Sequence, residues 1–197
     1  MVKAIRECSS DAILDLHMCV YKPARFVEAM KDAGADRFIF QFESMADETE
    51  LLDLAKRITD AGMKCGISIN PSTSADSLNS ILASGLISVV NLLAVEPGFG
   101  GQKFNPVTLN KIEYLLQLRR ENGYSFEIGV DGEETLRIDS ILLCHPISLV
   151  VSQSRPLCAF QEGSTTTLHQ KCPKQTSWLP VHMCFDIQSL FLRDSRT

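Results

Sequence analysis

Short apolar runs alternate with amphipathic stretches between residues 12 and 130, and this alternation constrains the fold more than any other feature of the chain. The runs are rich in apolar and β-branched residues: AILDLHMCV (12–20), DRFIFQFES (36–44), KCGISIN (64–70), SVVNLLAV (88–95) and SFEIGV (125–130). Runs of this kind are typical of strands covered on both faces. Strands that alternate with helices, without hairpin signals, predict βαβ units and a parallel sheet.

The stretches between the runs carry helix start and stop signals. Pro23 suits the first position of a helix, and Gly34 suits its end. Asp47 followed by Glu50 is a variant of the capping box at the start of the next helix. The segment PVTLNKIEYLLQLRRENG predicts a longer helix that ends at Gly123.

Periodicity leaves two architectures open, an open doubly wound sheet and a (β/α)8 barrel. In both, ligands bind at the carboxyl ends of the strands. We therefore expect the functional residues to follow the strands directly.

Composition excludes several classes of protein. The 197 residues predict one domain, and the net charge of −5 gives no reason to expect a nucleic-acid partner. No apolar run reaches the roughly 18 residues of a transmembrane helix, and the N-terminus lacks the apolar region of a secretory signal. Seven cysteines without a regular spacing favour a reducing compartment. We expect a cytoplasmic protein with no membrane partner.

Three features lie at predicted strand ends. The loop VEPGFGGQKF (95–104) is glycine-rich, so its backbone N–H groups could surround a phosphate, although a plain flexible loop has the same composition. His17 could bind a metal, but a histidine at a strand end is more often a hydrogen-bonded structural residue. Asp131 could point into a pocket or cap the following helix.

The pattern changes after about residue 132. We assign residues 1–155 to a partial (β/α)8 barrel and residues 156–197 to a divergent tail that could be disordered. In the tail, His169 and Cys172 give H-x2-C, and His182 and Cys184 give H-x-C. The pattern weakly suggests zinc ligation, but its spacing is atypical, and unrelated residues in a tail are the simpler interpretation.

The stretches VEPGFGGQKF, LDLHMCV followed by KPARFVEAMKDAGADRF, and VDG resemble the ribulose-phosphate 3-epimerase family. The resemblance implies a (β/α)8 barrel that epimerises C3 of D-ribulose 5-phosphate to D-xylulose 5-phosphate in the pentose phosphate pathway. It also implies a divalent metal ion (Fe²⁺, Mn²⁺, Zn²⁺ or Co²⁺) on the C2 and C3 oxygens of the substrate. Two aspartates on opposite faces then exchange the proton.

The resemblance also implies roles for individual residues. Asp131 matches a catalytic aspartate that binds the metal, and His17 matches a metal-binding histidine. The positions that match substrate-binding residues are His17, Met18, Gly98, Phe99, Gly100, Gly101, Gln102, Gly132, Ser152 and Ser154.

The chain also departs from the family pattern. The opening VKAIRE resembles the family's second helix, so we expect this sequence to lack the family's first two strands, with their segment of the type H-x-D-x-M-D-G. Residues 148–154 match the eighth strand only faintly. Gln41 stands where many members have histidine, and Glu133 replaces a glycine. We expect an incomplete barrel with weak activity, or alternatively a non-catalytic subunit that binds a full-length epimerase. Homo-oligomers are also compatible with this expectation. A hexulose-phosphate epimerase is a further alternative, which we consider less favoured than the pentulose-phosphate enzyme.

An incomplete barrel predicts low stability, because unpaired strand edges and half-filled interior layers remain. Thermal melting of the purified chain is expected to show a broad transition, or a transition of an associated form. A sharp monomeric transition above about 60 °C would contradict this expectation, since ordinary mesophilic domains melt at or below that range.

Overall fold

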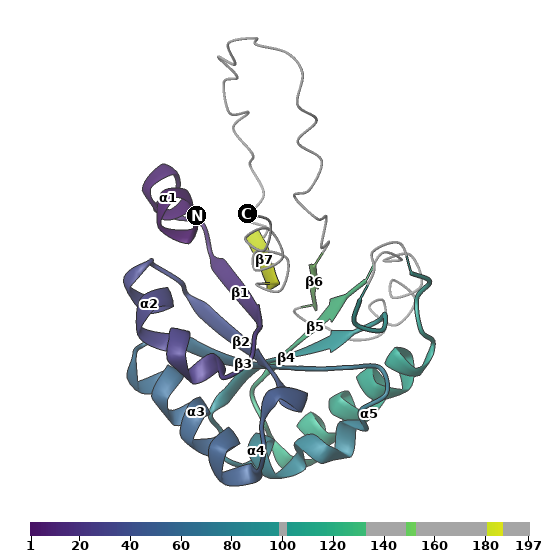
Figure 1. Cartoon of the computed structure of the whole chain (residues 1–197). Coiled ribbons are helices and arrows are strands. Elements are labelled where there is room, and N and C mark those ends of the chain that lie inside the picture. Colours follow the sequence, from purple (N-terminus) through teal and green to yellow (C-terminus); the bar gives the residue numbers. More distant parts are fainter. Residues whose placement is uncertain (99–101, 133–148, 153–180, 187–197) are drawn as a thin grey trace, which may run out of the picture.

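The computed structural model describes residues 1–98, 102–132, 149–152 and 181–186. In these residues all strand pairing is parallel, and the strands form one sheet in the order β6-β5-β4-β3-β2-β1-β7 (Figure 1). The strands are β1 Leu14–Cys19, β2 Arg37–Gln41, β3 Lys64–Ile69, β4 Ile87–Leu93, β5 Glu127–Asp131, β6 Leu149–Ser152 and β7 Val181–Asp186. The five strands predicted between residues 12 and 130 are confirmed.

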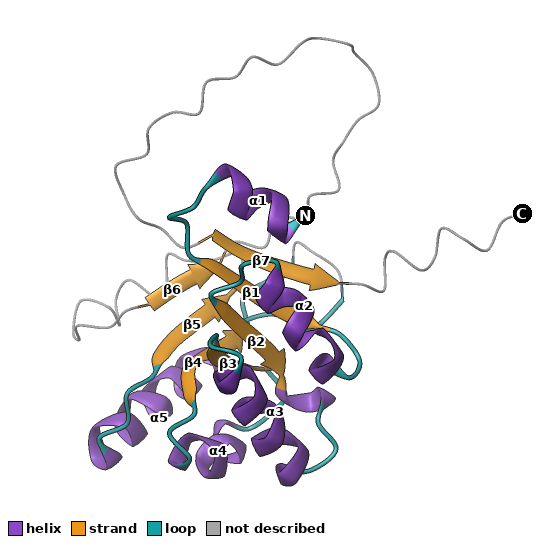
Figure 2. Ribbon diagram, turned by 90° about the vertical axis from the view of Figure 1, so that its left-hand side faces the viewer, coloured by secondary structure: helices purple, strands orange, loops and turns teal. Residues whose placement is uncertain are grey.

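Four helices cover the convex side of the curled sheet in the described part of the chain (Figures 1 and 2). They are α2 Val27–Asp32, α3 Glu48–Asp60, α4 Asn79–Ala83 and α5 Val107–Asn122, with α1 Val2–Cys8 at the N-terminus. Short 3-10 turns occupy residues 23–26, 42–44 and 75–78. Among the described residues, no helix has the length and apolar character needed to cross a bilayer.

The predicted start of α3 and end of α5 are confirmed, whereas Pro23 begins a 3-10 turn and α2 itself begins at Val27. The Asp47 side chain accepts a hydrogen bond from Glu50 N at 2.8 Å, and Glu50 Oε2 accepts one from Ala46 N at 2.8 Å. At the far end of α5, Gly123 adopts a left-handed conformation with φ 67°. This is the conformation in which glycine avoids the steric cost of a Cβ.

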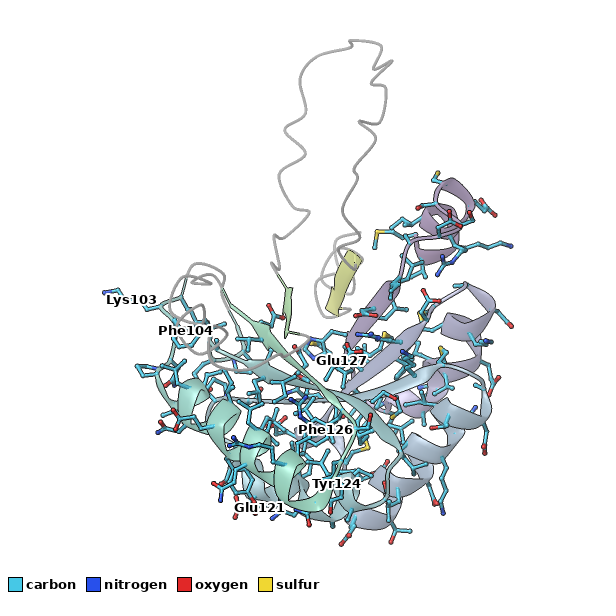
Figure 3. The ribbon with its side chains drawn as sticks, turned by 180° about the vertical axis from the view of Figure 1, so that it is seen from behind. Lys103, Phe104, Glu121, Tyr124, Phe126 and Glu127 are labelled. Atoms are coloured by element: carbon cyan, nitrogen blue, oxygen red, sulfur yellow. The ribbon has the colours of Figure 1, made fainter. Side chains whose placement is uncertain are left out.

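The two faces of the sheet differ in chemistry. Leu14, Leu16 and Met18 of β1 belong to the hydrophobic core beneath the helices. Successive strand residues face opposite sides, so Asp15 and His17 belong to the inner, concave face. Phe126 and Glu127, adjacent in sequence, likewise separate toward the core and the concave side (Figure 3).

The sheet is an incomplete barrel, as predicted. β6 and β7 are its two ends, and no pairing joins them within the described strands. β6 lies at the position predicted for the faintly matched eighth strand. β7 comes from the segment that the sequence assigned to a divergent tail, and it adds to β1 on the side away from β2.

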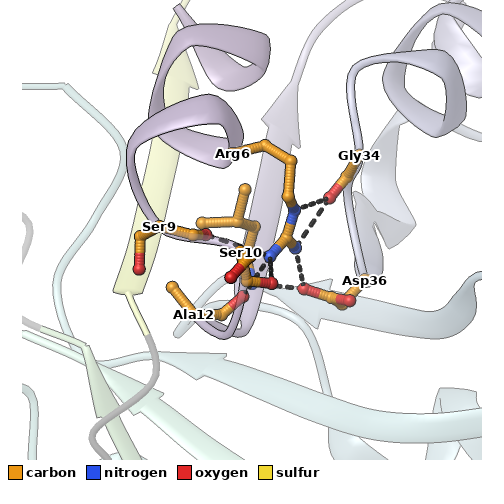
Figure 4. A network of polar contacts seen from close by, with 7 residues as sticks. Arg6, Ser9, Ser10, Ala12, Gly34 and Asp36 are labelled. Carbon is orange, nitrogen blue, oxygen red and sulfur yellow. Dashed lines mark hydrogen bonds and ion pairs between the residues drawn. The ribbon is translucent and has the colours of Figure 1, made fainter.

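Arg6 fastens α1 to the start of the sheet (Figure 4). Its Nε and Nη2 donate to Gly34 O at 3.0 and 2.8 Å, and its Nη1 donates to Ala12 O at 2.7 Å. Nη2 also pairs with Asp36 Oδ2 at 2.5 Å, and the same oxygen accepts a hydrogen bond from Leu14 N. One guanidinium therefore holds α1 against the starts of β1 and β2.

A buried ionic cluster crosses the concave face. Arg37 Nη1 of β2 lies 3.2 Å from Asp15 Oδ2 of β1 and 2.9 Å from Glu127 Oε2 of β5. Asp15 is 1% exposed, and its Oδ1 has no hydrogen-bond partner among the described residues. Burial raises the pKa of Asp15 to about 6, although the neighbouring Arg37 opposes the rise. The cluster holds two carboxylates and one guanidinium, so a proton on Asp15 relieves excess negative charge.

This raised pKa predicts a pH-dependent stability difference between the wild type and Asp15→Asn. The folded pKa of about 6 lies above the ordinary value near 3.9, so the folded state takes up the proton first as the pH falls. Between about pH 7 and pH 4, the free energy of unfolding of the wild type should therefore rise relative to Asp15→Asn. The expected change is up to about 3 kcal/mol, because each pKa unit corresponds to about 1.4 kcal/mol.

Denaturant unfolding at several pH values measures this difference. Asp53→Asn, at an exposed position of α3, is the matched control and should run parallel to the wild type. If the free energies of unfolding of the wild type and Asp15→Asn changed in parallel with pH, the raised pKa of Asp15 would be contradicted.

Candidate functional site

The carboxyl ends of β1, β2 and β3 carry a connected polar network. His17 is 1% exposed, and its Nε2 lies 3.0 Å from Gln41 Oε1. Gln41 Nε2 in turn donates to Glu43 Oε2 at 2.7 Å and to Asn70 Oδ1 at 2.9 Å. A carboxylate accepts only, so the Gln41 amide must turn its NH₂ group toward Glu43 and its oxygen toward His17. His17 Nε2 therefore carries the proton, and the ring's lone pair is on Nδ1.

The network is anchored by the loop after β3 and by α5. Glu43 Oε1 accepts hydrogen bonds from Asn70 N, at 2.9 Å, and from the Thr73 hydroxyl. Lys111 Nζ donates to Asn70 O at 2.7 Å and to Thr73 O at 2.5 Å. Burial lowers the pKa of Lys111, against the opposing effect of Glu43 and Glu96. These contacts hold Gln41 in one orientation beneath His17.

Cys19, the last residue of β1, lies beside His17. Its Sγ lies 3.5 Å from His17 Nε2 and 3.7 Å from His17 Nδ1. The two residues are two positions apart on one strand, so both belong to the concave face. The thiol thus adjoins both ring nitrogens of the histidine.

Asp131 lies on the other side of the half-barrel, at the end of β5, and is 5% exposed. The register runs from His17 through Ile39, Gly66 and Val89 to Glu127 of β5. His17 and Asp131 therefore both lie on the concave face, each near the carboxyl end of its strand.

The remaining predicted residues are placed as follows. Gly98 has φ 141°, and a Cβ built there would meet nothing within 4 Å. Gln102 Nε2 donates to Glu96 O at 2.6 Å and so ties the two ends of the glycine loop. At Gly132, a Cβ would lie 2.8 Å from Ala94 Cβ, so the ends of β4 and β5 approach too closely for a larger residue.

Ser152 ends β6 as the register partner of Asp131. Met18 packs in the core on the face opposite His17 and is 1% exposed, so it does not join His17 on the concave face. Phe99, Gly100, Gly101 and Ser154 lie outside the described residues. Their predicted roles stay predictions.

The described side chains supply only part of a metal site. Within them, no group of three or more histidine, cysteine, aspartate or glutamate side chains could hold an ion. His17 and Asp131 are donors of the types that the first-row divalent metals accept, and the orientation of Gln41 is the usual support for a ligating histidine. The predicted metal ion therefore stays a prediction.

Sequence reasoning missed the Gln41–Glu43–Asn70–Lys111 network and Cys19. One signal was available, because Gln41 and Asn70 follow apolar strand residues just as His17 does. Nothing in the sequence paired Lys111 with the loop after β3, since that contact joins positions 38 and 41 residues apart.

A comparison with family models now identifies the protein's relatives. The model of the ribulose-phosphate 3 epimerase family matches residues 1–142. The chain belongs to this family. The ribulose-phosphate 3-epimerase of Chlamydia muridarum is 37% identical over 131 residues, which cover 64% of this chain and 55% of that protein. The enzyme of Treponema pallidum is 38% identical and covers 78% of this chain and 66% of its own length.

A rice relative named as a cytoplasmic isoform is 34% identical over 133 residues, covering 67% of this chain and 55% of that protein. The chain thus spans between about half and two thirds of the length of these relatives.

Solved structures confirm the barrel architecture. The crystal structure of KGPDC from Streptococcus mutans has a TM-score of 0.53 at 17% identity, and the match covers 76% of this chain and 65% of that one. A mutant tryptophan synthase α-subunit from Pyrococcus furiosus has a TM-score of 0.51 at 22% identity, and the match covers 76% and 59%. At these identities the likeness shows the fold alone.

The orientation of Gln41 predicts the tautomer of His17. In the wild type, nitrogen NMR shifts of the ring should report a proton on Nε2. Gln41→Leu removes the acceptor and should shift the tautomer ratio by roughly fivefold, because a hydrogen bond contributes about 1 kcal/mol. Gln41→Glu keeps an acceptor and should preserve the wild-type tautomer. Gln117→Leu, on the exposed side of α5, is the control, and an unchanged tautomer in Gln41→Leu would refute the assignment.

Proposed function

We propose that the chain binds D-ribulose 5-phosphate and catalyses its metal-assisted epimerisation at C3 to D-xylulose 5-phosphate, in the pentose phosphate pathway of the cytoplasm. The observation that carries the proposal is the family match over residues 1–142, which includes both His17 and Asp131. Both residues lie on the concave face near the carboxyl ends of β1 and β5, and this location supports the proposal.

Asp131 is the group that would take the C3 proton. Its carboxylate is 5% exposed, so water competes little for the proton that it removes. A divalent ion (Fe²⁺, Mn²⁺, Zn²⁺ or Co²⁺), held by His17 and Asp131, would supply Lewis-acid stabilisation for the negative charge that develops on the sugar oxygens. At Gly98 a Cβ would meet nothing within 4 Å, so a phosphate has room to approach the backbone there.

Inversion at C3 needs a proton donor on the face opposite Asp131. A single carboxylate that takes and returns the proton on one face restores the original configuration. We therefore expect the isolated chain to exchange the C3 hydrogen with solvent faster than it inverts the centre.

A second candidate is a non-catalytic subunit that binds a full-length epimerase or another copy of the chain. The observation that favours it is that β6 and β7 are the outer strands of the described sheet and do not pair with each other. Sheet edges of this kind can pair with strands of another chain.

The test supplies D-ribulose 5-phosphate in D₂O with each of the four metal ions and follows the C3 position by NMR. The wild type should incorporate deuterium at C3 and form xylulose 5-phosphate more slowly. Asp131→Asn should lower the exchange rate by about 10²–10⁴-fold, the usual effect of losing a general base. Asp53→Asn serves as the exposed carboxylate control.

Equal exchange by the wild type and Asp131→Asn would refute the proposed role of Asp131. No exchange with any of the metals, together with mixed oligomers when a full-length epimerase is added, would favour the subunit.

A further inference from the structure

Ser68 of β3 and Asn91 of β4 are buried polar residues to which the proposed reaction assigns no role. Ser68 is 0% exposed and Asn91 is 1% exposed. Ile67 and Leu92, which adjoin them in the strands, belong to the hydrophobic core beneath the helices. Ser68 and Asn91 therefore face the concave side of the sheet. The two residues are register partners, and Asn91 Nδ2 donates a hydrogen bond to Ser68 Oγ at 3.3 Å.

This pair does not use its full hydrogen-bonding capacity. A carboxamide oxygen is an acceptor, and a hydroxyl group can donate as well as accept. The bond from Nδ2 to Oγ leaves Asn91 Oδ1 and the Ser68 hydroxyl proton without a partner among the described residues. Asp15 Oδ1 is the one fully enclosed side-chain atom of that part of the chain that lacks a hydrogen bond. Asn91 Oδ1 is therefore not fully enclosed, and it borders the space inside the curl of the sheet.

A buried amide with an unpaired oxygen indicates a ligand. Leaving a buried polar group without a partner is destabilising, and nearly all such groups in folded proteins have one. Ser68 and Asn91 lie on the two strands between β2, which carries Gln41, and β5, which carries Asp131. Gly129, the register partner of Asn91 on β5, contributes no side chain. The pair therefore adjoins the part of the concave face that carries Asp131.

The chemistry of the pair matches an alcohol rather than an ion. Neither side chain is charged, and the unpaired oxygen of Asn91 disfavours a phosphate, whose oxygens are also acceptors. A single hydroxyl group can donate to Asn91 Oδ1 and accept from the hydroxyl of Ser68. Because a hydroxyl does both, it satisfies the amide in either of its two orientations.

We propose that Ser68 and Asn91 bind the C1 hydroxyl of a pentulose 5-phosphate, an inference that rests on the proposed function. In that reaction the C2 and C3 oxygens meet the metal ion, and C4 lies between C3 and the phosphate. The glycine loop proposed for the phosphate follows β4, whereas Asn91 and Ser68 lie within their strands, before Leu93 and Ile69. The C1 end of the sugar, which is farthest from the phosphate, is therefore the end that reaches the pair.

Titration calorimetry with D-xylulose 5-phosphate and 1-deoxy-D-xylulose 5-phosphate tests the proposal on the full chain. The two sugars share the carbon chain and the phosphate and differ only in the C1 hydroxyl. EDTA prevents metal-assisted turnover during the titration. The wild type should bind the 1-deoxy sugar roughly tenfold more weakly, the usual effect of leaving a buried polar group unpaired. Equal affinities, which are expected if the pair holds only a buried water molecule, would overturn the proposal.

Two variants locate the preference at this pair. Asn91→Leu should lower the affinity for D-xylulose 5-phosphate by about tenfold and leave that for the 1-deoxy sugar unchanged. Ser68→Ala is a smaller change that should reduce the preference in the same direction, and it covers the case in which Asn91→Leu does not fold. Asn110→Leu, at an exposed position of α5, is the matched control and should keep the wild-type preference. An undiminished preference in Ser68→Ala or in folded Asn91→Leu would overturn the proposal.

The binding measurement and the C3 exchange assay can fail independently. A preference for the C1 hydroxyl without C3 exchange would leave the binding site standing and count against the epimerisation. C3 exchange with equal affinities for the two sugars would support the proposed function and overturn the site. No binding of either sugar by the wild type would likewise overturn the site.

Discussion

The hydrogen-bonded register of the parallel sheet decides which polar side chains meet in this protein. Side chains alternate between the two faces, so a shift of one residue would move His17 to the core and Met18 to the concave face. The observed register keeps Leu14, Leu16 and Met18 under the helices and leaves the polar residues of β1 inside the curl. Asp131, at the end of β5, belongs to the same concave face.

The concave face combines tight packing with buried charge. At Gly66 a Cβ would lie 2.4 Å from Val89 Cγ1 and 2.7 Å from Ile39 Cγ1, so the middle of the sheet admits only glycine there. Nearer the amino ends of the strands, Arg37 forms ion pairs with Asp15 and with Glu127 on the concave face. Burying such groups is costly unless they are paired, and here the guanidinium pairs with both carboxylates. Toward the carboxyl ends of the strands, the hydrogen bonds of Gln41 hold the His17 ring in one orientation.

The sequence predicted correctly those elements whose formation depends on residues close together in the chain. The apolar runs predicted β1 to β5, and Asp47 with Glu50 predicted the start of α3 because the cap is made within four residues. His17 and Asp131 could be singled out because they lie near the carboxyl ends of predicted strands, and the family resemblance gave them roles.

The strand β7 escaped prediction, because VHMCFD lies in a segment of polar clusters and prolines, and its partner β1 is more than 160 residues away. The Asp15–Arg37–Glu127 cluster also joins residues distant in sequence, which no periodicity reveals. What distinguishes β7 from an unstructured tail is its ladder with β1. That ladder places residues 182–184, His-Met-Cys, on the strand next to residues 17–19, which have the same sequence.

Amide hydrogen exchange along β7 tests this arrangement most directly. If β7 pairs with β1, the amides of residues 181–186 that donate to the ladder should exchange much more slowly than those of an unstructured peptide. Exchange of these amides at the rate of an unstructured peptide, while the amides of β2 and β3 remain protected, would contradict the account.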